Sequence, residues 1–357
     1  MLKRLIIKDF KCLFEEDMEF RNLTILTGEN SSGKSSVIQA ILFLGHNPAI
    51  STPFAQEILQ YLHSLGNIAE LTNKLQNAKE FYLKAEFDND EEIESTFSQK
   101  EAKLAQHIKK FKFPNQLSYV YNLFYLNADR IRPQKQNPLR DIIDIKNFGI
   151  AGQYVASYFE IHKREPVEKE LIKDPSSYTL ETQVNYWLKR ITGFNLEFYT
   201  EKISSNLVKS FYKTEEGFEF SPENIGIGVS YLVAILIVCL SAQKGNIVII
   251  ENPEIHLHPK SQAMLGEFFA FIASKGIQII IETHNDHILN RIRYEVFKKN
   301  LASQDVIVYY RGLKDKRFEK IEITQEGFFK RESSDYGFPE GFYDATLKEI
   351  YEINRRR

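Results

Sequence analysis

The sequence predicts an α/β protein in which a mixed sheet with flanking helices is split by a mostly helical inserted lobe. A glycine-rich run lies between an expected strand and an expected helix near the N-terminus, at residues 28–35. A second series of alternating helices and strands follows at about residues 225–310. Its strands, such as Ile247–Ile250, are continuously apolar, which is typical of parallel strands covered on both faces. We therefore expect the first and the last parts of the chain to share one core.

Composition indicates a globular protein with a large core. The 357 residues carry a net charge of −2 and 43% of them are hydrophobic, so no global charge points to nucleic acid. Only Cys12 and Cys239 occur, which suits a reducing compartment. The charged N-terminus does not fit a signal peptide, and the apolar run Tyr231–Leu240 is too short to cross a bilayer. We expect a cytoplasmic protein without membrane contact.

The N-terminal part is expected to form a hairpin, a third strand and a helix, at Leu2–Asp9, Phe14–Phe20, Leu23–Thr27 and Ser36–Leu44. Between the third strand and the helix lies the pattern G-x-x-x-x-G-K-S, formed by Gly28, Glu29, Asn30, Ser31, Ser32, Gly33, Lys34 and Ser35. The glycines let the backbone curl so that N–H groups face phosphate oxygens, and the helix adds its positive dipole end. We expect Lys34 to contact the β- and γ-phosphates and Ser35 to bind Mg²⁺. The loop thus predicts binding of a nucleoside triphosphate.

The middle of the chain, residues 46–224, is expected to form the inserted lobe. Its expected elements are helices and loops at Asn47–Asn77, strands at Phe81–Phe87 and Leu117–Asn127, an acidic loop at 88–94, a helix at Gln99–Lys110, helices within 143–192 and antiparallel strands within Phe194–Phe220. The strands are predicted by aromatic and β-branched residues. Trp187 is expected to lie in the core of this lobe.

The second αβ series is expected to complete the core, with residues 225–330. Its elements are helices at Val229–Ala242, Lys260–Ser274 and Asn285–Lys299 and strands at Asn246–Glu251, Gln278–Thr283 and Asp305–Tyr310. Residues 331–357 are expected to form a tail. Its final helix would pack on the core, because Leu347, Ile350 and Tyr351 recur at helical spacing.

Two carboxylates follow the first strand of this series. Glu251 ends an apolar strand, and in a phosphate-loop ATPase such a carboxylate lies beside the loop and holds Mg²⁺ directly or through water. Glu254, three residues later, is expected near the γ-phosphate. The plainer alternative is a buried strand followed by acidic turn residues.

The next strand ends in a histidine, and the preceding helix begins with glycine and serine. His284 follows a parallel strand, where ligands bind, so it is suited to sense the γ-phosphate or to polarise the attacking water. Gly228 and Ser230 open a helix and so offer a second anion site. Zinc remains an alternative, with candidate ligands at His256, His258, His284, Asp286 and His287.

In this order, the motifs resemble the ABC-like ATPases of the SMC, RecF and OLD group rather than membrane transporters. Leu5–Lys11 looks like the first strand of that group, Glu251–Pro259 like its magnesium strand and dimer loop, and Glu282–His287 like its histidine switch. The chain is most similar to a bacterial subgroup of AAA-type ATPases that is often found among phage-defence genes. Asn185–Leu188 and Gly337–Phe342 also look like that subgroup.

The resemblance implies an ABC-type P-loop NTPase core that binds ATP and Mg²⁺. Its nucleotide-binding residues would be Gly28, Glu29, Asn30, Ser31, Ser32, Gly33, Lys34, Ser35 and Ser36, with Ser35 and Glu251 on the metal. Two subunits would sandwich two ATP molecules, so that Gly228 and Ser230 of one subunit touch the γ-phosphate held by the other. His284 would act as the switch, and the loop around His258 would cross the interface. The expected assembly is a homodimer or a higher homo-oligomer.

The strand end departs from the usual Asp-Glu of that group, because Glu251 and Asn252 stand there. A neutral amide cannot accept a proton from water. Either Glu254 acts as the base, or hydrolysis is slow and ATP serves mainly as a clamp between subunits. The expected activity is ATP hydrolysis, with catalytic residues Lys34, Glu251, Glu254 and His284.

Two functions from different classes stay open. The first is an ATP-dependent sensor or assembly platform in anti-phage defence, and the second is a RecF-like or SMC-like ATPase that binds DNA in repair. A transporter subunit is disfavoured by the reduced signature around Gly228. The insert shows no sustained heptads and no nuclease signature, so any effector is expected to be a separate polypeptide.

Nucleic-acid contact would depend on local basic clusters. Candidates are Lys109, Lys110 and Lys112; Arg130, Arg132, Lys135 and Arg140; and Arg355–Arg357. Such clusters are what phosphate contacts require. Solvated surface charge, or arginines that serve the nucleotide site, would explain them equally.

Overall fold

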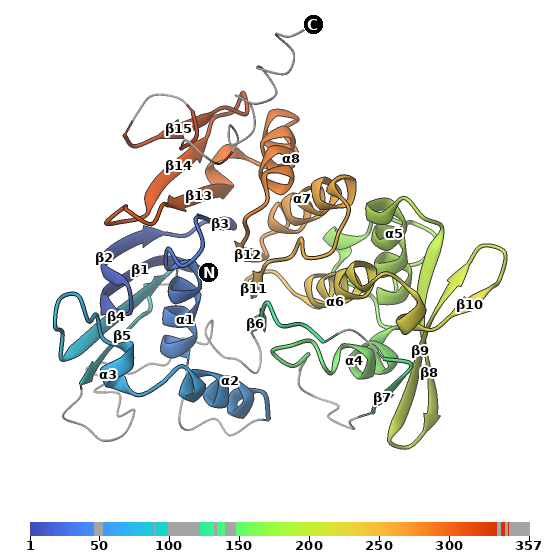
Figure 1. Ribbon diagram of the computed structural model, residues 1–357. Helices are drawn as coiled ribbons and strands as arrows, with labels where there is room; N and C mark the ends of the chain where they lie inside the picture. The colour runs from blue at the N-terminus through green and yellow to red at the C-terminus, as the bar shows by residue number, and fades with distance from the viewer. Residues whose placement is uncertain are drawn as a thin grey trace, which may run out of the picture.

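The computed structural model describes residues 1–45, 53–88, 90–98, 122–131, 134–139, 148–333, 337–339 and 342. The helix expected at Gln99–Lys110 and the one expected beyond Ala345 lie outside these residues, as does the first part of the strand expected at Leu117–Asn127. Elements from both ends of the chain meet in the middle of the molecule (Figure 1).

The central sheet has the strand order β15-β14-β13-β3-β12-β11-β6 within the described residues. Its strands are β3 (Leu23–Gly28), β6 (Leu123–Leu126), β11 (Ile247–Glu251), β12 (Gln278–Glu282), β13 (Val306–Arg311), β14 (Glu319–Ile323) and β15 (Phe329–Arg331). The five strands from β13 to β6 are parallel, whereas β14 and β15 are antiparallel. The expected mixed sheet is confirmed. Because β12 lies between β3 and β11, the ends of these three strands are neighbours at one edge.

A second sheet, with the order β2-β1-β4-β5, packs beside the first and is antiparallel. Its strands are β1 (Leu2–Phe10), β2 (Leu13–Glu19), β4 (Glu80–Phe87) and β5 (Glu92–Ser98). The buried side chain of Gln278 joins the two sheets, since its amide accepts from Leu2 N at 2.8 Å and donates to Leu2 O at 2.8 Å.

Three of these strands correct the expected boundary of the inserted lobe. β4 and β5 pair with the N-terminal hairpin, and β6 lies at the edge of the central sheet, although all three fall within residues 46–224. The expected acidic loop also gives way to β5 from Glu92 onward. Alternation explains this strand, because Ile93 and Phe97 are buried while Glu94 faces outward and accepts from Tyr82 Oη at 2.7 Å.

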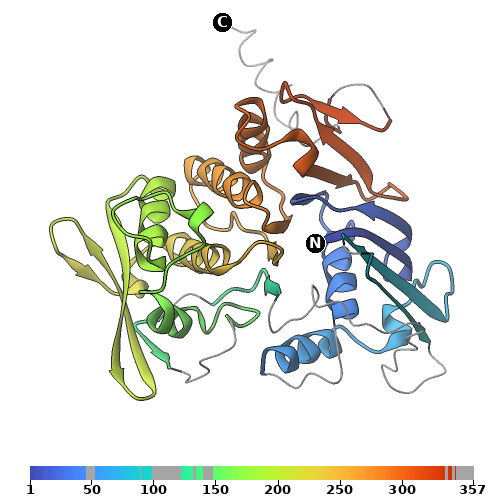
Figure 2. The same ribbon diagram turned by 180° about the vertical axis from the view of Figure 1, so that it is seen from behind.

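The described part of the insert from residue 134 onward forms a peripheral lobe of helices and strands. It contains α4 (Val155–His162), α5 (Leu180–Thr192), β7 (Gln136–Pro138), β8 (Leu196–Ser204), β9 (Leu207–Thr214) and β10 (Glu219–Phe220). The antiparallel pairing expected within Phe194–Phe220 is confirmed. Figures 1 and 2 show β8 and β9 as a long ribbon at the edge of the molecule, beyond the helices.

Helices cover both faces of the central sheet. They are α1 (Lys34–Gly45), α6 (Ile227–Ser241), α7 (Pro259–Ala273) and α8 (Asp286–Phe297). Two further helices lie away from the central sheet: α2 (Pro53–Ser64) contacts α1, and α3 (Ile68–Leu71) contacts β4 of the second sheet. Short 3₁₀ helices lie at Lys169–Leu171, Pro222–Asn224 and Ser303–Asp305. Within the described ranges, no helix combines the length and the apolar character that a membrane span requires.

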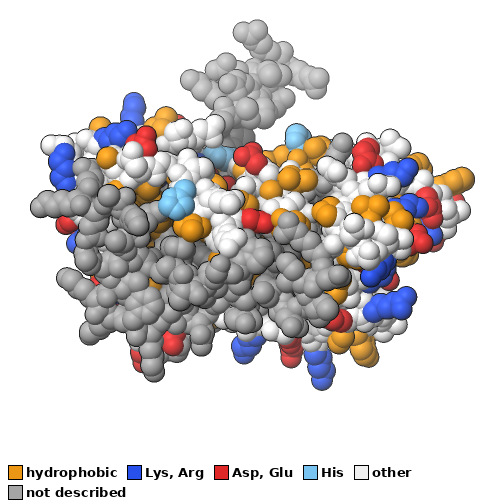
Figure 3. Space-filling model, turned by 90° about the horizontal axis from the view of Figure 1, so that it is seen from below, with side chains coloured by type: hydrophobic (Ala, Val, Ile, Leu, Met, Phe, Trp, Pro, Cys, Tyr) orange, Lys and Arg blue, Asp and Glu red, His pale blue; other side chains and the backbone are white. Residues whose placement is uncertain are grey.

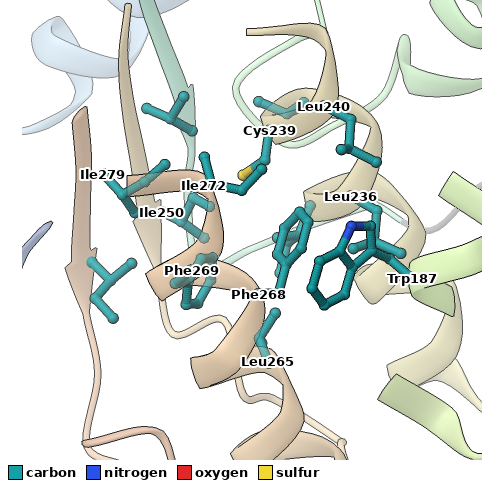
Figure 4. Packing of buried hydrophobic residues seen from close by; sticks show 14 of the residues in the cluster. Trp187, Leu236, Cys239, Leu240, Ile250, Leu265, Phe268, Phe269, Ile272 and Ile279 are labelled. Atoms are coloured by element: carbon teal, nitrogen blue, oxygen red, sulfur yellow. The ribbon is translucent and has the colours of Figure 1, made fainter. Parts of the chain in front are cut away.

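The lobe and the core share one hydrophobic cluster. Trp187 on α5 is 1% exposed, and its ring centroid lies 5.0 Å from that of Phe268 on α7 (Figure 4). The ring centroid of Phe271, also on α7, lies 5.2 Å away. Between them, α6 is buried on every side from Leu232 to Leu240. Trp187 is therefore a core residue, as expected, but it holds the lobe onto the central sheet.

Candidate functional site

The phosphate-loop pattern connects β3 to α1, as its position between a strand and a helix predicts. Gly28 has a φ of +129°, and a Cβ there would lie 2.1 Å from Arg311 O. Gly33 has a φ of +101°, and a Cβ there would lie 2.7 Å from Cys12 Sγ. Both positions require glycine, because neighbouring strands and the β1–β2 turn press against the loop.

Lys34 lies folded over this loop. It is 3% exposed, and its Nζ donates to Gly28 O at 3.2 Å and to Glu29 O at 2.6 Å. Burial lowers the pKa of Lys34, while the nearby Glu282 and Glu29 carboxylates oppose that shift. The Lys34 ammonium group thus lies beside the loop backbone and the N-terminus of α1, a location that suits an anionic ligand.

The flanking loop residues differ in exposure. Glu29, Asn30 and Ser31 are exposed, whereas Ser32 and Ser36 are buried. The Glu29 side chain accepts a hydrogen bond from Leu313 N. The exposed side chains of the loop therefore belong to its first half.

Glu251 ends β11 as a buried carboxylate with two donors. Its Oε1 accepts from Tyr125 Oη at 2.9 Å and its Oε2 accepts from Ala128 N at 3.2 Å. Burial raises the pKa of Glu251. The turn after β11 is fixed by Arg130, whose guanidinium donates to the carbonyls of Glu251 and Asn252.

The Arg130 guanidinium is therefore not available on the surface for a contact with nucleic-acid phosphates. The residue is 4% exposed and serves the strand end instead of the expected basic cluster. Of that cluster, Arg132 and Arg140 lie outside the described residues, as do the other two clusters, Lys109, Lys110 and Lys112, and Arg355–Arg357. On the described part of the face in Figure 3, basic and acidic side chains are interspersed.

Glu254 and His284 are joined across the site. His284 N donates to Glu254 Oε1 at 3.0 Å. Burial raises the pKa of Glu254. Desolvation and the Lys34 cation both lower the pKa of His284, so its exposed imidazole favours the neutral form. The structure thus brings together the loop, Glu251, Glu254 and His284, whose roles in binding and catalysis stay predictions.

Sequence reasoning did not assign a role to Glu282, which lies in the same site. Its Oε1 accepts from Ser35 Oγ at 3.0 Å, and it pairs with Glu251 in the sheet register. Burial, followed by the Glu251 charge, raises the pKa of Glu282 to about 7. The signal was present, because Glu282 ends an apolar parallel strand just as Glu251 does.

The side chains in this site fit a hard cation such as Mg²⁺. Carboxylate and hydroxyl oxygens from Ser35, Glu251 and Glu282 lie at one sheet edge, and Mg²⁺ prefers oxygen ligands. Among the described residues, Glu282 Oε2 and Asn252 Oδ1 are buried without a hydrogen-bond partner. A cation with its water shell would satisfy such oxygens.

Zinc fits less well. Within the part of the chain that the structure describes, no group of three or more His, Cys, Asp or Glu side chains lies close enough to hold a metal ion. His258 caps α7 instead, since its Nδ1 accepts from Lys260 N at 3.3 Å. The histidines of this region therefore give the zinc alternative no geometric support.

The expected second anion site at the start of α6 is largely enclosed. Ser230 is 0% exposed, and its Oγ accepts from Tyr212 Oη at 3.3 Å. A Cβ on Gly228 would lie 2.3 Å from His256 O, so this glycine allows α6 to pack against the loop after β11. The Ser230 hydroxyl is thus enclosed within its own subunit, and its expected contact with the nucleotide of a second subunit stays a prediction.

Comparison with known proteins gives one family over most of the chain. The profile of the family described as "AAA domain, putative AbiEii toxin, Type IV TA system" matches residues 23–290. Curated relatives named "DNA replication and repair protein RecF" are 39% identical in Histophilus somni (strain 2336) and 36% identical in Pasteurella multocida (strain Pm70), each over 61 residues. These alignments span 17% of this chain and 17% of each relative.

Two solved structures are similar over nearly the whole chain. An Smc head bound to the C-winged helix domain of ScpA aligns with a TM-score of 0.59 at 16% identity, covering 90% of this chain and 97% of that one. An Smc head with an extended coiled coil, bound to the C-terminal domain of ScpA derived from Pyrococcus furiosus, gives 0.58 at 14% identity, covering 99% of both. At such identity the likeness shows the fold, and it confirms the ABC-type P-loop core.

Proposed function

Because the chain belongs to this AAA-domain family, we propose that it is a Mg²⁺-dependent ATPase with its site at the carboxyl edge of the central sheet. One observation carries the proposal: the loop that bears Lys34 and Ser35 adjoins the ends of β11 and β12, where Glu251, Glu254 and His284 converge. Phosphoryl transfer needs such positioning and charge more than covalent chemistry.

Each residue has a distinct part in this proposal. Lys34 leaves the loop carbonyls and contacts the β- and γ-phosphates, while Ser35 and Glu251 hold the metal ion. Mg²⁺ neutralises charge that develops on the phosphates. His284, next to Lys34 and favouring its neutral form, is placed to hydrogen-bond the γ-phosphate without adding a second cation.

Glu254 is the proposed base. Asn252 occupies the usual position but cannot take a proton, whereas Glu254 is half-buried and its carboxylate accepts a hydrogen bond from His284 N. A raised pKa makes this carboxylate a stronger proton acceptor than an ordinary glutamate once it is ionised. The hydrogen bond from His284 N fixes the Glu254 carboxylate relative to the end of β12, the strand that leads to His284.

We further propose that ATP drives assembly into a homodimer or higher homo-oligomer. Since Ser230 is enclosed, we expect the backbone at the exposed Gly226, just before α6, to face the nucleotide of the second subunit. The SMC heads to which the chain is similar were solved with a bound protein partner, which supports a partner protein here as well.

The biological role that we favour is an ATP-dependent sensor or assembly platform, in anti-phage defence, for a separate effector. The family description, which names a toxin of a toxin–antitoxin system, supports a conflict-related role. A DNA-repair ATPase is the second candidate, and the 61-residue similarity to RecF proteins favours it. DNA-dependent hydrolysis separates the two.

The test is ATP turnover and mass in solution for the wild type, Glu254→Gln and Lys34→Ala, with and without DNA. We expect the wild type to hydrolyse ATP, Glu254→Gln to lose about 10²–10⁴-fold in rate while ATP holds it as an oligomer, and Lys34→Ala to bind no ATP. Unchanged turnover in Glu254→Gln would remove Glu254 as the base. Stimulation of the wild type by DNA would favour the repair function.

A further inference from the structure

The hydroxyl that would bind Mg²⁺ is contacted by a carboxylate outside the proposed machinery. Ser35 Oγ donates to Glu282 Oε1 at 3.0 Å. Glu282 is 5% exposed and ends β12, the strand between β3 and β11, so the backbone on both sides fixes its position. The contact is therefore part of the sheet edge rather than a chance meeting of mobile surface groups.

Glu251, the carboxylate assigned to the metal, is engaged elsewhere. Its two oxygens accept from Tyr125 Oη and from Ala128 N, which come from β6 and the segment after it. Among the described residues, Glu282 is thus the carboxylate that meets Ser35, although it belongs to the strand that leads to His284 rather than to β11.

A serine that binds a cation does so through an oxygen lone pair, so its hydrogen must point to an acceptor elsewhere. Glu282 Oε1 is such an acceptor at hydrogen-bond distance, and it is buried, so water does not compete for it. Groups that hydrogen-bond a metal ligand without touching the metal itself fix the orientation of that ligand.

We propose that Glu282 is a positioning residue that accepts the Ser35 hydroxyl proton and so turns Ser35 Oγ toward Mg²⁺. The inference rests on the proposed Mg²⁺-ATP function. In it, Glu282 acts because its side chain is long enough to place an oxygen at hydrogen-bond distance from Ser35 Oγ, and its negative charge is not required. It also ties the metal side of the site to the strand that carries His284, because Glu282 and His284 are two residues apart.

Two conservative substitutions separate reach from charge. Glu282→Gln keeps an acceptor oxygen at the same distance from Ser35 Oγ but removes the negative charge. Glu282→Asp keeps the charge, but its side chain is one methylene shorter and its oxygens lie farther from Ser35 Oγ. We expect Mg²⁺ affinity, measured by calorimetry with a non-hydrolysable ATP analogue, to stay within about threefold in Glu282→Gln. It should fall about 10–100-fold in Glu282→Asp.

Ser35→Ala and the double variant Ser35→Ala/Glu282→Asp complete a cycle. If Glu282 acts through Ser35, the double variant binds Mg²⁺ no more weakly than Ser35→Ala alone. A larger loss in Glu282→Gln than in Glu282→Asp would overturn the proposal in favour of charge, and equal losses in the two would overturn the role of reach. Additive losses in the double variant would show that Glu282 acts independently of Ser35. Unchanged affinity in Glu282→Asp would overturn it outright.

Controls keep this test apart from the proposed function. Binding of the analogue without Mg²⁺ should be the same in the wild type and both Glu282 variants, and thermal unfolding without ligand should show that each variant folds. Failure of the wild type to bind the analogue would reject the proposed function itself, whereas a wild type that binds with both Glu282 variants unaffected would reject only the role of Glu282.

Discussion

The phosphate loop leaves no room for a side chain at Gly33. Its φ of +101° strains any other residue, and a Cβ would lie 2.7 Å from Cys12 Sγ and 2.9 Å from Leu13 Cδ2. We expect Gly33→Ala to lower ATP affinity more than tenfold and to destabilise the fold by about 1–3 kcal/mol. Calorimetry with ATP and chemical denaturation measure the two effects.

The control for this substitution is Gly217→Ala. Gly217 also has a positive φ, of +87°, but nothing lies within 4 Å of its added Cβ. It reports the backbone cost alone, far from the site. Equal ATP affinity in Gly33→Ala and Gly217→Ala would show that the close approach of the β1–β2 turn is not needed for binding.

At the same scale, sequence predicted the residue types of the site better than their contacts. Lys34, Glu251, Glu254 and His284 follow from motifs because each motif states a chemical need at a fixed chain position. The environment of Ser230 does not, since its burial under Tyr212 depends on β9, eighteen residues away in the chain. The Ser35–Glu282 contact likewise joins residues 247 positions apart.

Among the described elements, α5 joins the lobe to the core through its contacts with α6 and α7. Trp187 fills the space between α5 and α7, and its ring contacts Phe268 and Phe271. We expect Trp187→Ala to destabilise the protein by about 3–5 kcal/mol, because it leaves a large cavity. Urea unfolding checks this value, and Tyr178→Ala, at a 59% exposed ring, should change it by less than about 0.5 kcal/mol.

Element positions were predictable where the apolar pattern is long and continuous. The strand expected at Asn246–Glu251 is β11 (Ile247–Glu251), and the helix expected at Val229–Ala242 is α6 (Ile227–Ser241). The strand β5 was missed, because its alternating glutamates suggested a solvated loop until β4 supplied a partner. The local pattern of apolar and polar residues does not show which strand another strand will pair with in the sheet.

For the whole molecule, a buried ion pair joins the two sheets behind the phosphate loop. Glu16 on β2 lies 3.6 Å from the Arg311 guanidinium at the end of β13 and accepts from Phe318 N at 3.2 Å. Burial raises the pKa of Glu16 from 4.5 to about 7, while Arg311 and Arg317 pull it down. Between about pH 4.5 and 7 the folded state thus holds a proton on Glu16 that the unfolded chain releases, and the ion pair with Arg311 forms as this proton leaves.

This pKa shift predicts a pH dependence of stability. A raised pKa in the folded state means that stability is full below about pH 4.5 and declines as pH rises through about 7. We expect Glu16→Gln to flatten this decline by up to about 3 kcal/mol, measured by denaturation at pH 5 and pH 8. The remaining slope would come from Glu282 and from other carboxylates whose pKa is also raised, such as Glu251 and Glu254. An unchanged slope in Glu16→Gln would contradict the assignment.

The contact between Cys12 and Gly33 also places a reporter at the mouth of the nucleotide loop. Cys12 is exposed, whereas Cys239, the other cysteine of the chain, is buried in α6 with a raised pKa. A maleimide should therefore label the native protein once, at Cys12. We expect saturating ATP to slow that labelling and Lys34→Ala to abolish the protection, so that mass spectrometry can follow loop occupancy without a fluorescent nucleotide. Labelling at equal rates with and without ATP would show that the β1–β2 turn stays open when the loop is filled.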